Sequence, residues 1–442
     1  MAALGDDVRA TSDTAVEHLR RLLQIDTTNP PGNETAAAEY LAAVLADEGF
    51  EPQVLESSPW RGSVVARYRG TGERPPLLLY GHTDVVTADA EYWTHEPFSG
   101  DLADGCVWGR GALDMKSMVA QELMVMLLLQ RSGVKLSRDV IFAATADEEA
   151  GGLAGMGFLV DQHPELVRAE FGLSEGGGTT MYVAGRPLYD IRTAEKGTFR
   201  FKLRVRGEPG HGSIPRDETA VSKLAEAVVR LARTTLPLRP TPSFESFFAV
   251  LTDMLALPAS QREPTEENLQ RVYGMVPSAL ADYVRAISHD TAVPTGLQAG
   301  KKVNVIPSVA EASVDGRYLP GQDEEGFVSE IRELIGSELG MELMNRSLPL
   351  EGSADSELYR SIEEVVQRHA PEARVTPIML SGATDAKHVS RLGTTCLGFG
   401  PVKISDTFPA DQLVHGHDER VPVDGYLWGI DVLYDIVSEF CR

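Results

Sequence analysis

The chain has 442 residues, of which 43% are hydrophobic and 24% charged, as in ordinary soluble globular proteins. These values argue against a disordered chain, a collagen-like repeat or a membrane bundle, and the length predicts two domains. The formal charge of −24, from 65 acidic and 41 basic residues with no local basic patch, argues against nucleic acid as a partner.

The distribution of cysteines and apolar residues predicts a soluble cytoplasmic protein with no membrane partner. Residues 1–10 contain no apolar core of the kind that a secretory signal requires. The longest apolar run, Leu123–Leu129, is far shorter than the roughly 20 residues of a membrane-spanning helix. The cysteines are too few and too scattered for a disulfide framework or a Cys-x-x-Cys zinc site: Cys106, Cys396 and Cys441.

From residue 14 to residue 180, short apolar runs typical of strands alternate with helix-like stretches. The clearest strands are Leu77–Tyr80 and Val140–Thr145, and a long helix follows Asp114. Strands that alternate with helices predict an α/β domain with a largely parallel sheet covered on both faces.

A different pattern begins near residue 196. Phe199–Arg206 alternates strictly between apolar and cationic residues, which predicts an antiparallel, half-exposed strand. A helix through Leu224 and Leu231, strands within Val303–Tyr318 and a helix at Phe327–Leu339 complete a small α+β domain. Helical and strand-like segments then resume, so we expect this domain to be inserted into the first. The predicted ranges are 1–196 and 350–442 for the first domain and 197–349 for the second.

Two sequence motifs place polar residues directly after predicted strands. Gly-His-Thr-Asp at residues 81–84 follows the first strand, and His82 could bind a metal while Asp84 orients its ring. Asp-Glu-Glu at residues 147–149 follows the second strand and precedes two glycines. Alone, the first motif is more often a structural hydrogen bond, and acidic runs are usually solvated.

Three further residues could join the same site. Asp114 ends a glycine-rich loop before the long helix, where an ordinary helix N-cap is the alternative interpretation. Glu175 follows another short apolar run, and His415 lies near the C-terminus. Together these residues offer nitrogen and oxygen ligands without a thiolate, which suits a hydrolytic zinc centre. A bridging carboxylate among them suits a pair of ions.

In order and wording these motifs resemble those of the M20 family of metallopeptidases, and the resemblance covers nearly the whole chain. The family includes aminoacylases, acetylornithine deacetylase, succinyl-diaminopimelate desuccinylase and carboxypeptidases. The motifs are Gly-His-Thr-Asp, Gly-Arg-Gly-x-x-Asp-Met-Lys, Asp-Glu-Glu-x-Gly-Gly, Ser-Glu-Gly and His-x-His-Asp-Glu. The resemblance implies an α/β/α sandwich catalytic domain that binds zinc, with an inserted ferredoxin-like lid that also forms a homodimer.

The resemblance also assigns roles around two Zn²⁺ ions, for which Co²⁺ or Mn²⁺ could substitute. His82 and Glu175 would bind one ion, Glu149 and His415 the other, and Asp114 both. Asp84 would hold His82, and Glu148 would be the general base that accepts a proton from water and passes it to the departing amine. We expect Asp147 to be a solvated or capping acid and His417 a supporting polar group.

Outside the metal site, the resemblance implies a set of substrate-contacting residues. His211 would stabilise the oxyanion, often across a dimer. Asn304 and Arg317 would bind substrate from the lid, with the Arg317 guanidinium as the fork for a carboxylate. Gly382 and Thr384 would close on that carboxylate from the catalytic domain. A surface salt bridge is the alternative role for Arg317.

These inferences favour a dinuclear zinc enzyme that cleaves the amide bond of N-acyl amino acids. The alternatives are a metallocarboxypeptidase or dipeptidase acting beside a free C-terminus, and a scaffold that has lost catalysis. The segment 235–300 resembles an insertion in carboxypeptidase S-like members and offers either an apolar wall for an acyl chain or ordinary core packing: Phe244, Phe247, Phe248, Leu251 and Leu255.

Overall fold

The computed structural model describes residues 8–442 and divides into two compact units. Unit 1 comprises Met1–Thr193, Gly352–Pro377 and Thr384–Arg442, and unit 2 comprises Ala194–Glu351 and Ile378–Ala383. The last segment differs from the predicted ranges. It groups with unit 2 because the backbone N–H of Lys196 and the hydroxyl of Tyr283 donate to the carbonyls of Leu380 and Met379. The expectation about a secretory signal falls mainly on residues 1–7, outside the described residues.

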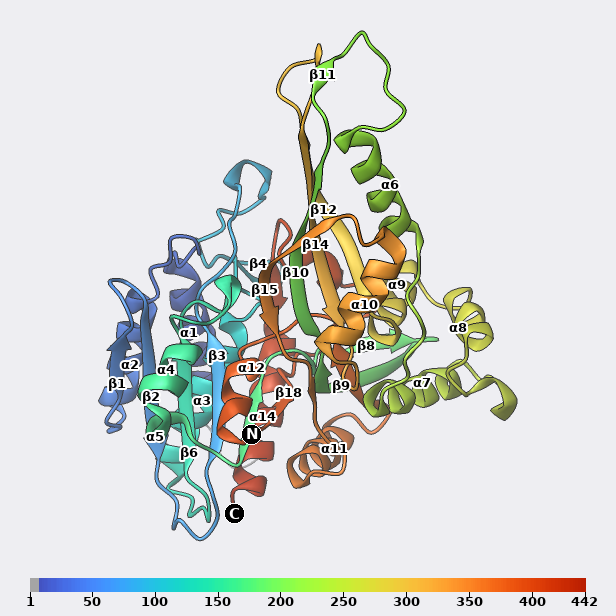
Figure 1. The fold of residues 1–442 in the computed structure, drawn as a ribbon. Helices are drawn as coiled ribbons and strands as arrows, with labels where there is room; N and C mark the ends of the chain where they lie inside the picture. The colour runs from blue at the N-terminus through green and yellow to red at the C-terminus, as the bar shows by residue number, and fades with distance from the viewer. Residues whose placement is uncertain (1–7) are drawn as a thin grey trace. The chain divides into compact units, whose positions relative to one another are not determined.

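Unit 1 is built from a central sheet, a small second sheet and the helices around them (Figure 1). Its helices are α1 (Val8–Gln24), α2 (Thr35–Asp47), α3 (Lys116–Ser132), α4 (Met156–Gln162), α5 (Pro164–Val167), α11 (Glu357–His369), α12 (Ala386–Val389), α13 (Ala410–Leu413) and α14 (Val423–Phe440). The 3₁₀ turns are η2 (Ala90–Tyr92), η3 (Glu148–Ala150) and η5 (Ser390–Leu392). Its strands are β1 (Gln53–Glu56), β2 (Gly62–Tyr68), β3 (Leu77–His82), β4 (Leu102–Ala103), β5 (Cys106–Trp108), β6 (Val140–Thr145), β7 (Phe171–Ser174), β8 (Met181–Val183), β9 (Arg186–Glu195), β17 (Arg374–Leu380), β18 (Thr395–Gly398) and β19 (Arg420–Pro422), of which β9 and β17 run on into unit 2.

The central sheet is parallel in the middle and antiparallel at its margins. Strands β6, β3, β7 and β18 pair in parallel, whereas β1–β2, β2–β6 and β18–β9 are antiparallel. The prediction of a largely parallel sheet is therefore right for the centre only. The carboxyl ends of β3, β6 and β7 lie at one edge, which is where open α/β sheets place ligands.

Both faces of this sheet are covered, which confirms the α/β/α sandwich. Alternate residues of β3 and β6 belong to two separate cores: Leu77, Leu79 and Phe142 pack with α1, α2, α3 and α14, whereas Leu78 and Ile141 pack with α4, α5 and α12. Helix α3 is buried from Lys116 to Leu129, and its continuous apolar run Leu123–Leu129 needs neighbours on every side.

Unit 2 contains a four-stranded sheet with helices on one face. Its elements are β10 (Gly197–Arg206), β11 (Gly210–His211), α6 (Ala220–Arg233), α7 (Pro242–Met254), η4 (Ala259–Gln261), α8 (Glu266–Tyr273), α9 (Ser278–Ser288), β12 (Thr291–Ala299), β13 (Val305–Ile306), β14 (Val309–Tyr318), α10 (Glu324–Ile335), β15 (Gly340–Ser347) and β16 (Leu350–Glu351). The antiparallel order β12-β14-β10-β15, with α6 and α10 in the two crossovers, is ferredoxin-like.

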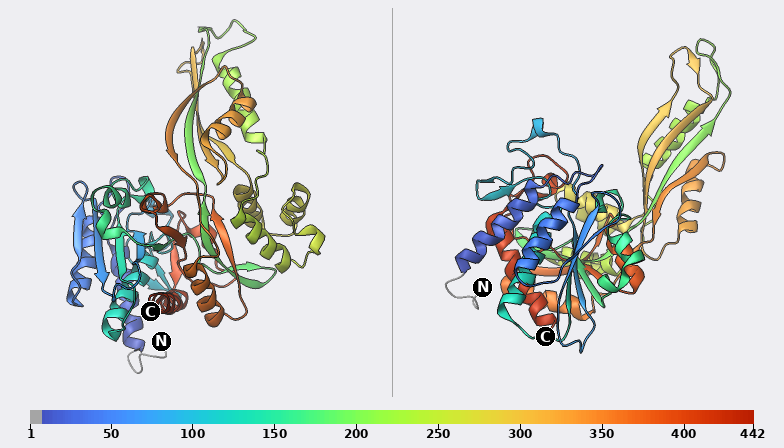
Figure 2. Two further views of the ribbon diagram at one scale, coloured as in Figure 1. Left: turned by 60° about the horizontal axis from the view of Figure 1, so that its bottom comes forward. Right: turned by 90° about the vertical axis from the view of Figure 1, so that its left-hand side faces the viewer.

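The predicted amphipathic strand is confirmed as β10. Its apolar residues pack under α6 and α10, which lie on the same side of the sheet in Figure 1 and in the left view of Figure 2. Its cations lie on the open face, where Arg200 and Arg204 pair across the strands with Asp315 and Glu311. Helix α10 ends at Ile335, earlier than predicted, because Gly336 has a positive φ of +89° and an extended ψ, which cannot continue a helix.

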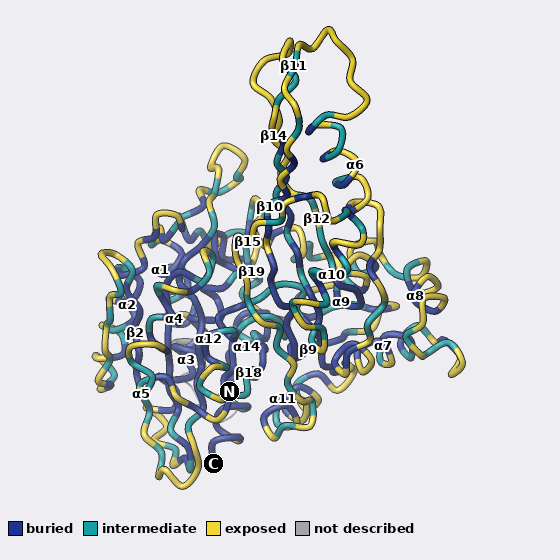
Figure 3. Tube along the Cα trace, viewed as in Figure 1, coloured by how far each residue is buried: buried dark blue, intermediate teal, exposed yellow. Residues whose placement is uncertain are grey.

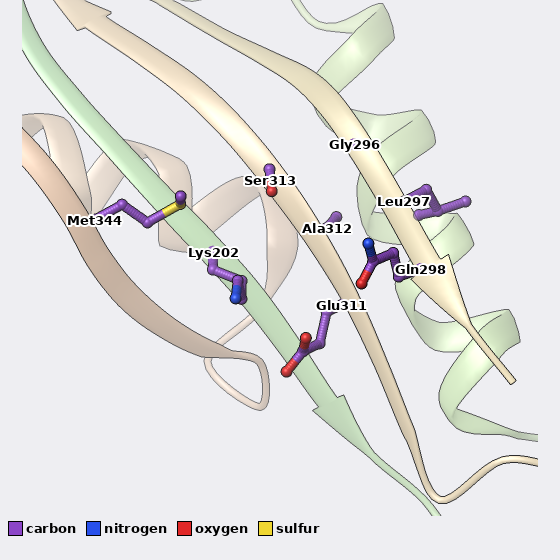
Figure 4. Close-up of a pocket in the computed structure, with 8 residues that line it drawn as sticks. All are labelled: Lys202, Gly296, Leu297, Gln298, Glu311, Ala312, Ser313 and Met344. Carbon is purple, nitrogen blue, oxygen red and sulfur yellow. The ribbon is translucent and has the colours of Figure 1, made fainter. Parts of the chain in front are cut away.

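The open face of this sheet carries a shallow groove of about 350 Å³ (Figure 4). Lys202, Glu311 and Met344 are among its lining residues, and none of the predicted site residues lines it. The aromatic residues of α7 are fully buried, so Phe244, Phe247 and Phe248 pack in a core rather than forming an apolar wall. No helix within residues 8–442 combines the length and apolar character that spanning a bilayer requires.

Candidate metal centre

One group of predicted ligands surrounds the end of β3. His82 is the last residue of that strand, and its Nε2 lies 3.2 Å from Asp114 Oδ1 and 3.8 Å from Glu175 Oε1. Glu175 follows the neighbouring parallel strand β7, which explains why the two side chains meet. One ligand atom from each of the three residues lies within 4.8 Å of the others.

A second group shares Asp114. His415 Nε2 lies 3.0 Å from Asp114 Oδ2 and 3.2 Å from Glu149 Oε1, and one ligand atom from each of these three residues also lies within 4.8 Å of the others. The two carboxylate oxygens of Asp114 therefore face different histidines. The N-cap interpretation of Asp114 is wrong, because α3 begins at Lys116 after Met115 and no side chain caps it.

The electrostatics of the site reflect a dense cluster of carboxylates. Hydrogen bonds to Asp114 and Glu149 raise the pKa of His415 to about 10. Burial alone would lower the pKa of His82, yet Asp114, Asp84 and Glu175 raise it well above its ordinary value. Burial raises the pKa of Glu175 to about 7 against the opposing effect of His82. The cluster thus favours positive charge among its carboxylates, which bound metal ions would supply.

Asp84 connects the two groups. His82 Nδ1 lies 2.9 Å from the backbone oxygen of Asp84 and 3.4 Å from its Oδ1, which leaves Nε2 to face the ligands. The backbone N–H groups of Glu148 and Glu149 donate to Oδ1 and Oδ2 of Asp84, both at 3.1 Å. Asp84 is fully buried, so it holds a histidine ligand on one side and the Glu148–Glu149 turn on the other.

Glu148, the predicted base, lies beside the ligand groups and not within them. Neither of the two metal-binding groups includes it. Burial, followed by the charge of Glu175, raises its pKa well above the ordinary value. The ammonium of Lys387, 3.7 Å from Glu148 Oε1, opposes that shift. Sequence reasoning missed Lys387, which follows the Gly-Ala-Thr-Asp segment by a few residues and gave no signal of its own.

Glu419 is a second residue whose role the sequence did not reveal. It is fully buried, and its carboxylate accepts hydrogen bonds from the Arg110 guanidinium and from the backbone N–H groups of Gly111, Leu113 and Asp114. It therefore fixes the loop that carries Asp114. The only sequence signal was its place at the end of the His-x-His-Asp-Glu motif.

Asp147 and His417, for which we expected no direct role in metal binding, each have a definite partner. Asp147 is buried rather than solvated, and its carboxylate pairs with Arg61 at 2.6 Å and accepts from the backbone N–H of Ala154 at 2.8 Å. His417 is exposed, and its ring lies against Tyr92 with centroids 5.1 Å apart. Neither residue belongs to the ligand groups.

The predicted substrate residues of unit 2 occupy two places. His211 is exposed on β11, which pairs with β13, and the N–H of Gly212 donates to the carbonyl of Asn304 beside it. In Figure 3 the segment around β11 is exposed. The Nδ1 atom of His211 lies 2.7 Å from the hydroxyl of Ser213. His211 and Asn304 therefore lie close together at the small two-stranded sheet formed by β11 and β13.

Arg317 does not present a free fork. Its Nε and Nη2 donate to the two oxygens of Asp315 at 2.6 and 3.3 Å, and its Nη1 donates to Thr198. A substrate carboxylate would have to displace Asp315, so the structure favours the salt-bridge alternative for this state. Gly382 belongs to unit 2, and Thr384, in unit 1, is buried with its hydroxyl accepting from Arg192 at 2.7 Å.

The ligand set fits a pair of divalent cations. Each group offers one imidazole nitrogen and carboxylate oxygens without a thiolate, which is the donor chemistry of zinc and related hydrolytic metals. The backbone oxygen of Asp84 lies 2.9 Å from His82 Nδ1 and orients the ring, an arrangement that is usual for metal-binding histidines. The Oε1 of Glu149 lies 3.2 Å from His415 Nε2, so the two atoms are close enough to bind one ion together.

Several known proteins are similar to this chain over most of its length. Aminoacylase-1 of Sus scrofa is 27% identical over 438 residues, which cover 96% of this chain and 94% of that protein. The N-fatty-acyl-amino acid synthase/hydrolase PM20D1 of Homo sapiens is 29% identical, with 96% of this chain and 87% of that protein covered. The probable carboxypeptidase S-like 2 of Dictyostelium discoideum is 29% identical, with 85% and 74% covered.

Solved structures show the same fold. The M20 family metallo-carboxypeptidase Sso-CP2 from Sulfolobus solfataricus matches with a TM-score of 0.73 at 17% identity, covering 96% of this chain and 99% of that one. The di-peptidase Dug1p from Saccharomyces cerevisiae matches with a TM-score of 0.70 at 14% identity, covering 98% and 97%.

A model of peptidase family M20/M25/M40 matches residues 78–439, a range that includes every residue of both ligand groups. The chain therefore belongs to peptidase family M20/M25/M40 and is a metal-dependent hydrolase.

Proposed function

We propose that the protein hydrolyses the amide bond of N-acyl amino acids and holds two zinc ions when active. The observation that carries this proposal is Asp114, whose two oxygens face His82 and His415 in separate ligand groups. Bound divalent cations would polarise the substrate carbonyl and lower the pKa of water. Co²⁺ and Mn²⁺ suit the same donors and would serve as substitutes.

Side chains of the protein would carry out proton transfer and stabilise the oxyanion. Glu148, held by Asp84 through its backbone N–H, would take a proton from the attacking water and pass it to the leaving amine. The ammonium of Lys387 would favour the ionised form of Glu148 that this step needs. His211 would donate to the developing oxyanion, and its exposed position on β11 is consistent with action on the partner of a homodimer formed through unit 2.

The substrate is proposed to be a small molecule with a free carboxylate, and Asn304, Arg317, Gly382 and Thr384 remain the proposed contacts. For Arg317 the proposal requires the carboxylate to replace Asp315 in the fork. Support for an N-acyl amino acid comes from the similarity to aminoacylase-1 over nearly the whole chain. We further propose a cytoplasmic location, which is supported by cysteines that are all free.

A metallocarboxypeptidase or dipeptidase is the second candidate, because the similar proteins include a carboxypeptidase and a di-peptidase. One substrate panel separates the two functions. Protein stripped with a chelator and reloaded with zinc is offered N-acetyl and N-lauroyl amino acids and dipeptides. Cleavage of the acyl amino acids alone supports the proposal, and cleavage of dipeptides alone supports the alternative. No zinc-dependent cleavage of any amide would refute both.

A further inference from the structure

A buried polar network lies behind the turn that carries Glu148 and Glu149. The two residues are adjacent, yet Glu149 belongs to a metal-binding group and Glu148 does not. Because successive side chains in a 3₁₀ turn point about 120° apart, the orientation of the turn η3 decides both roles at once. What fixes that turn is therefore part of the site.

The turn begins with a strained residue. Asp147 has a left-handed backbone with φ +74°, a conformation that costs an L-residue roughly 1 kcal/mol or more and must be held by its surroundings. Its carbonyl accepts from the N–H groups of Ala150 and Gly152 at 3.1 and 2.6 Å. Its carboxylate is gripped on both sides, by the N–H of Ala154 and by the guanidinium of Arg61.

Arg61 and Asn29 connect this residue to the rest of the site. Arg61 Nη2 lies 2.6 Å from Asp147 Oδ1 and 3.0 Å from the buried Glu34, and its Nη1 donates to the side-chain oxygen of Asn29 at 3.3 Å. The side-chain amide of Asn29 then donates to Asp84 Oδ2 at 2.8 Å and to Asp147 Oδ1 at 3.4 Å. Asn29 is buried, and the Arg61 side chain is 12% exposed.

The loop around Asn29 packs closely against the guanidinium of Arg61. The N–H of Asn29 donates to the carbonyl of Val85 at 2.8 Å, and the carbonyl of Pro31 accepts from Arg61 Nη1 at 2.9 Å. Gly32 lies so near that a Cβ there would approach Nη1 of Arg61 to 2.5 Å. The fork of an arginine, with its several donors in one plane, matches these acceptors, whereas a lysine ammonium cannot serve them together.

We infer that Arg61 and Asn29 are positioning residues that set the Glu148–Glu149 turn, so that one glutamate binds metal and its neighbour stays free to act as base. This inference rests on the proposed function for the role of Glu148. The expected effect on metal binding by the group that contains Glu149 does not depend on the proposed function. Neither residue contacts the predicted ligands, and both act through Asp147 and Asp84.

The decisive variant is Arg61→Lys, with Arg67→Lys as its matched control. Arg67 lies on β2, just after Arg61 in the sequence, and pairs with Asp139 at 3.1 Å and with the carbonyl of Glu165, none of which touches the turn. Arg61→Lys should weaken binding of one of two metal ions by about 10–100-fold, in line with other supports of metal ligands, and leave the other ion nearly unchanged. It should lower kcat by a similar factor with little change in KM.

Three measurements separate a positioning role from a general loss of stability. They are stepwise metal titration, kcat and KM on the best substrate, and hydrogen exchange of the peptide that contains residues 147–154 in the metal-free protein. Faster exchange in Arg61→Lys alone supports the inference. The inference is overturned if Arg61→Lys binds both ions with unchanged affinity. It is also overturned if Arg61→Lys and Arg67→Lys lose affinity for both ions to the same extent.

The inference can still be tested in two further cases. If Arg61→Lys fails to fold, Asp147→Asn replaces it, because asparagine tolerates the left-handed backbone but lacks the charge that pairs with Arg61. Retention of both ions at full affinity in that variant overturns the inference. If the wild type cleaves no amide, the proposed function fails, while the metal titration and the exchange measurement still decide the role of Arg61.

Discussion

Replacing Glu419 with glutamine should destabilise the fold and weaken the binding of both metal ions, although Glu419 is not a predicted ligand. Its Oε2 accepts from Arg110 at 2.6 Å and from the N–H of Gly111 at 3.0 Å. Its Oε1 accepts from the N–H groups of Leu113 and Asp114 at 2.7 and 3.1 Å. A carboxamide has only one oxygen, so it can serve only one of these two pairs of donors.

The charged donor decides which pair is kept. The amide oxygen should face Arg110, and the amide N–H₂ should then meet the N–H groups of Leu113 and Asp114, which lose their acceptor. Two buried donors without an acceptor at about 1–3 kcal/mol each, together with the lost charge on the buried Arg110 pair, give a total of roughly 3–6 kcal/mol. The turn that carries Asp114 should shift, and because Asp114 belongs to both groups, affinity should fall by about 10–100-fold for each ion.

The assay is urea unfolding of the metal-free protein at pH 8, followed by metal titration of the folded variant. Glu122→Gln is the matched control. Glu122 is also fully buried, but its carboxyl interacts with the backbone of Tyr80 rather than with the loop that carries Asp114, and burial raises its pKa well above the ordinary value. The same chemical change should therefore leave metal binding intact and stability unharmed there. Full affinity for both ions in Glu419→Gln would refute the proposed support of Asp114.

Four other outcomes are expected. Glu148→Ala should keep both metal ions and lose at least ~10²-fold in kcat, whereas Glu149→Ala should lose metal first; metal analysis beside kinetics checks this division. Mixed dimers of His211→Ala and Glu148→Ala should regain activity if His211 acts across the interface, and no recovery in verified heterodimers would place it elsewhere. Masking the substrate carboxylate as an amide should lower kcat/KM by about 30–1000-fold in the wild type and much less in Arg317→Ala. Because the folded-state pKa of Glu122 lies above its unfolded value, wild-type stability should fall as pH rises above about 4.5, and Glu122→Gln should remove that part of the fall in unfolding measurements at pH 5 and pH 8.

The fold could be predicted where its cause was local. The alternation of apolar and cationic residues in β10 and the apolar run of β6 each specify one strand and its buried face, and both strands are present. The antiparallel margins of the central sheet could not be read in this way. Strand direction depends on which neighbour a strand finds, and β2 meets β6 only after the chain has passed through β3 and α3.

The residues of the two candidate metal-binding groups could be named from the sequence because each lies beside a recognisable strand end or loop motif. Their supports could not be named in this way, because the partners are far apart in the sequence. Glu419 holds a loop at residues 110–114, and Arg61 holds Asp147. For Arg317 the sequence supplied a guanidinium of suitable chemistry but did not reveal its pairing in this state, in which Asp315, two residues away on the same face of β14, accepts from it.

Two buried carboxylates, those of Asp84 and Glu419, connect the two ligand groups by hydrogen bonds. Asp84 follows the ligand His82, yet its oxygens hold the N–H groups of the turn that carries Glu149 in the other group. Glu419 follows the ligand His415, and it holds the N–H of the shared ligand Asp114. Each support is fully buried, where a carboxylate needs its donors and a backbone donor needs its acceptor. Asp84 and Glu419 therefore each connect a histidine of one candidate group to a carboxylate residue of the other, although these residues come from separate segments of the chain.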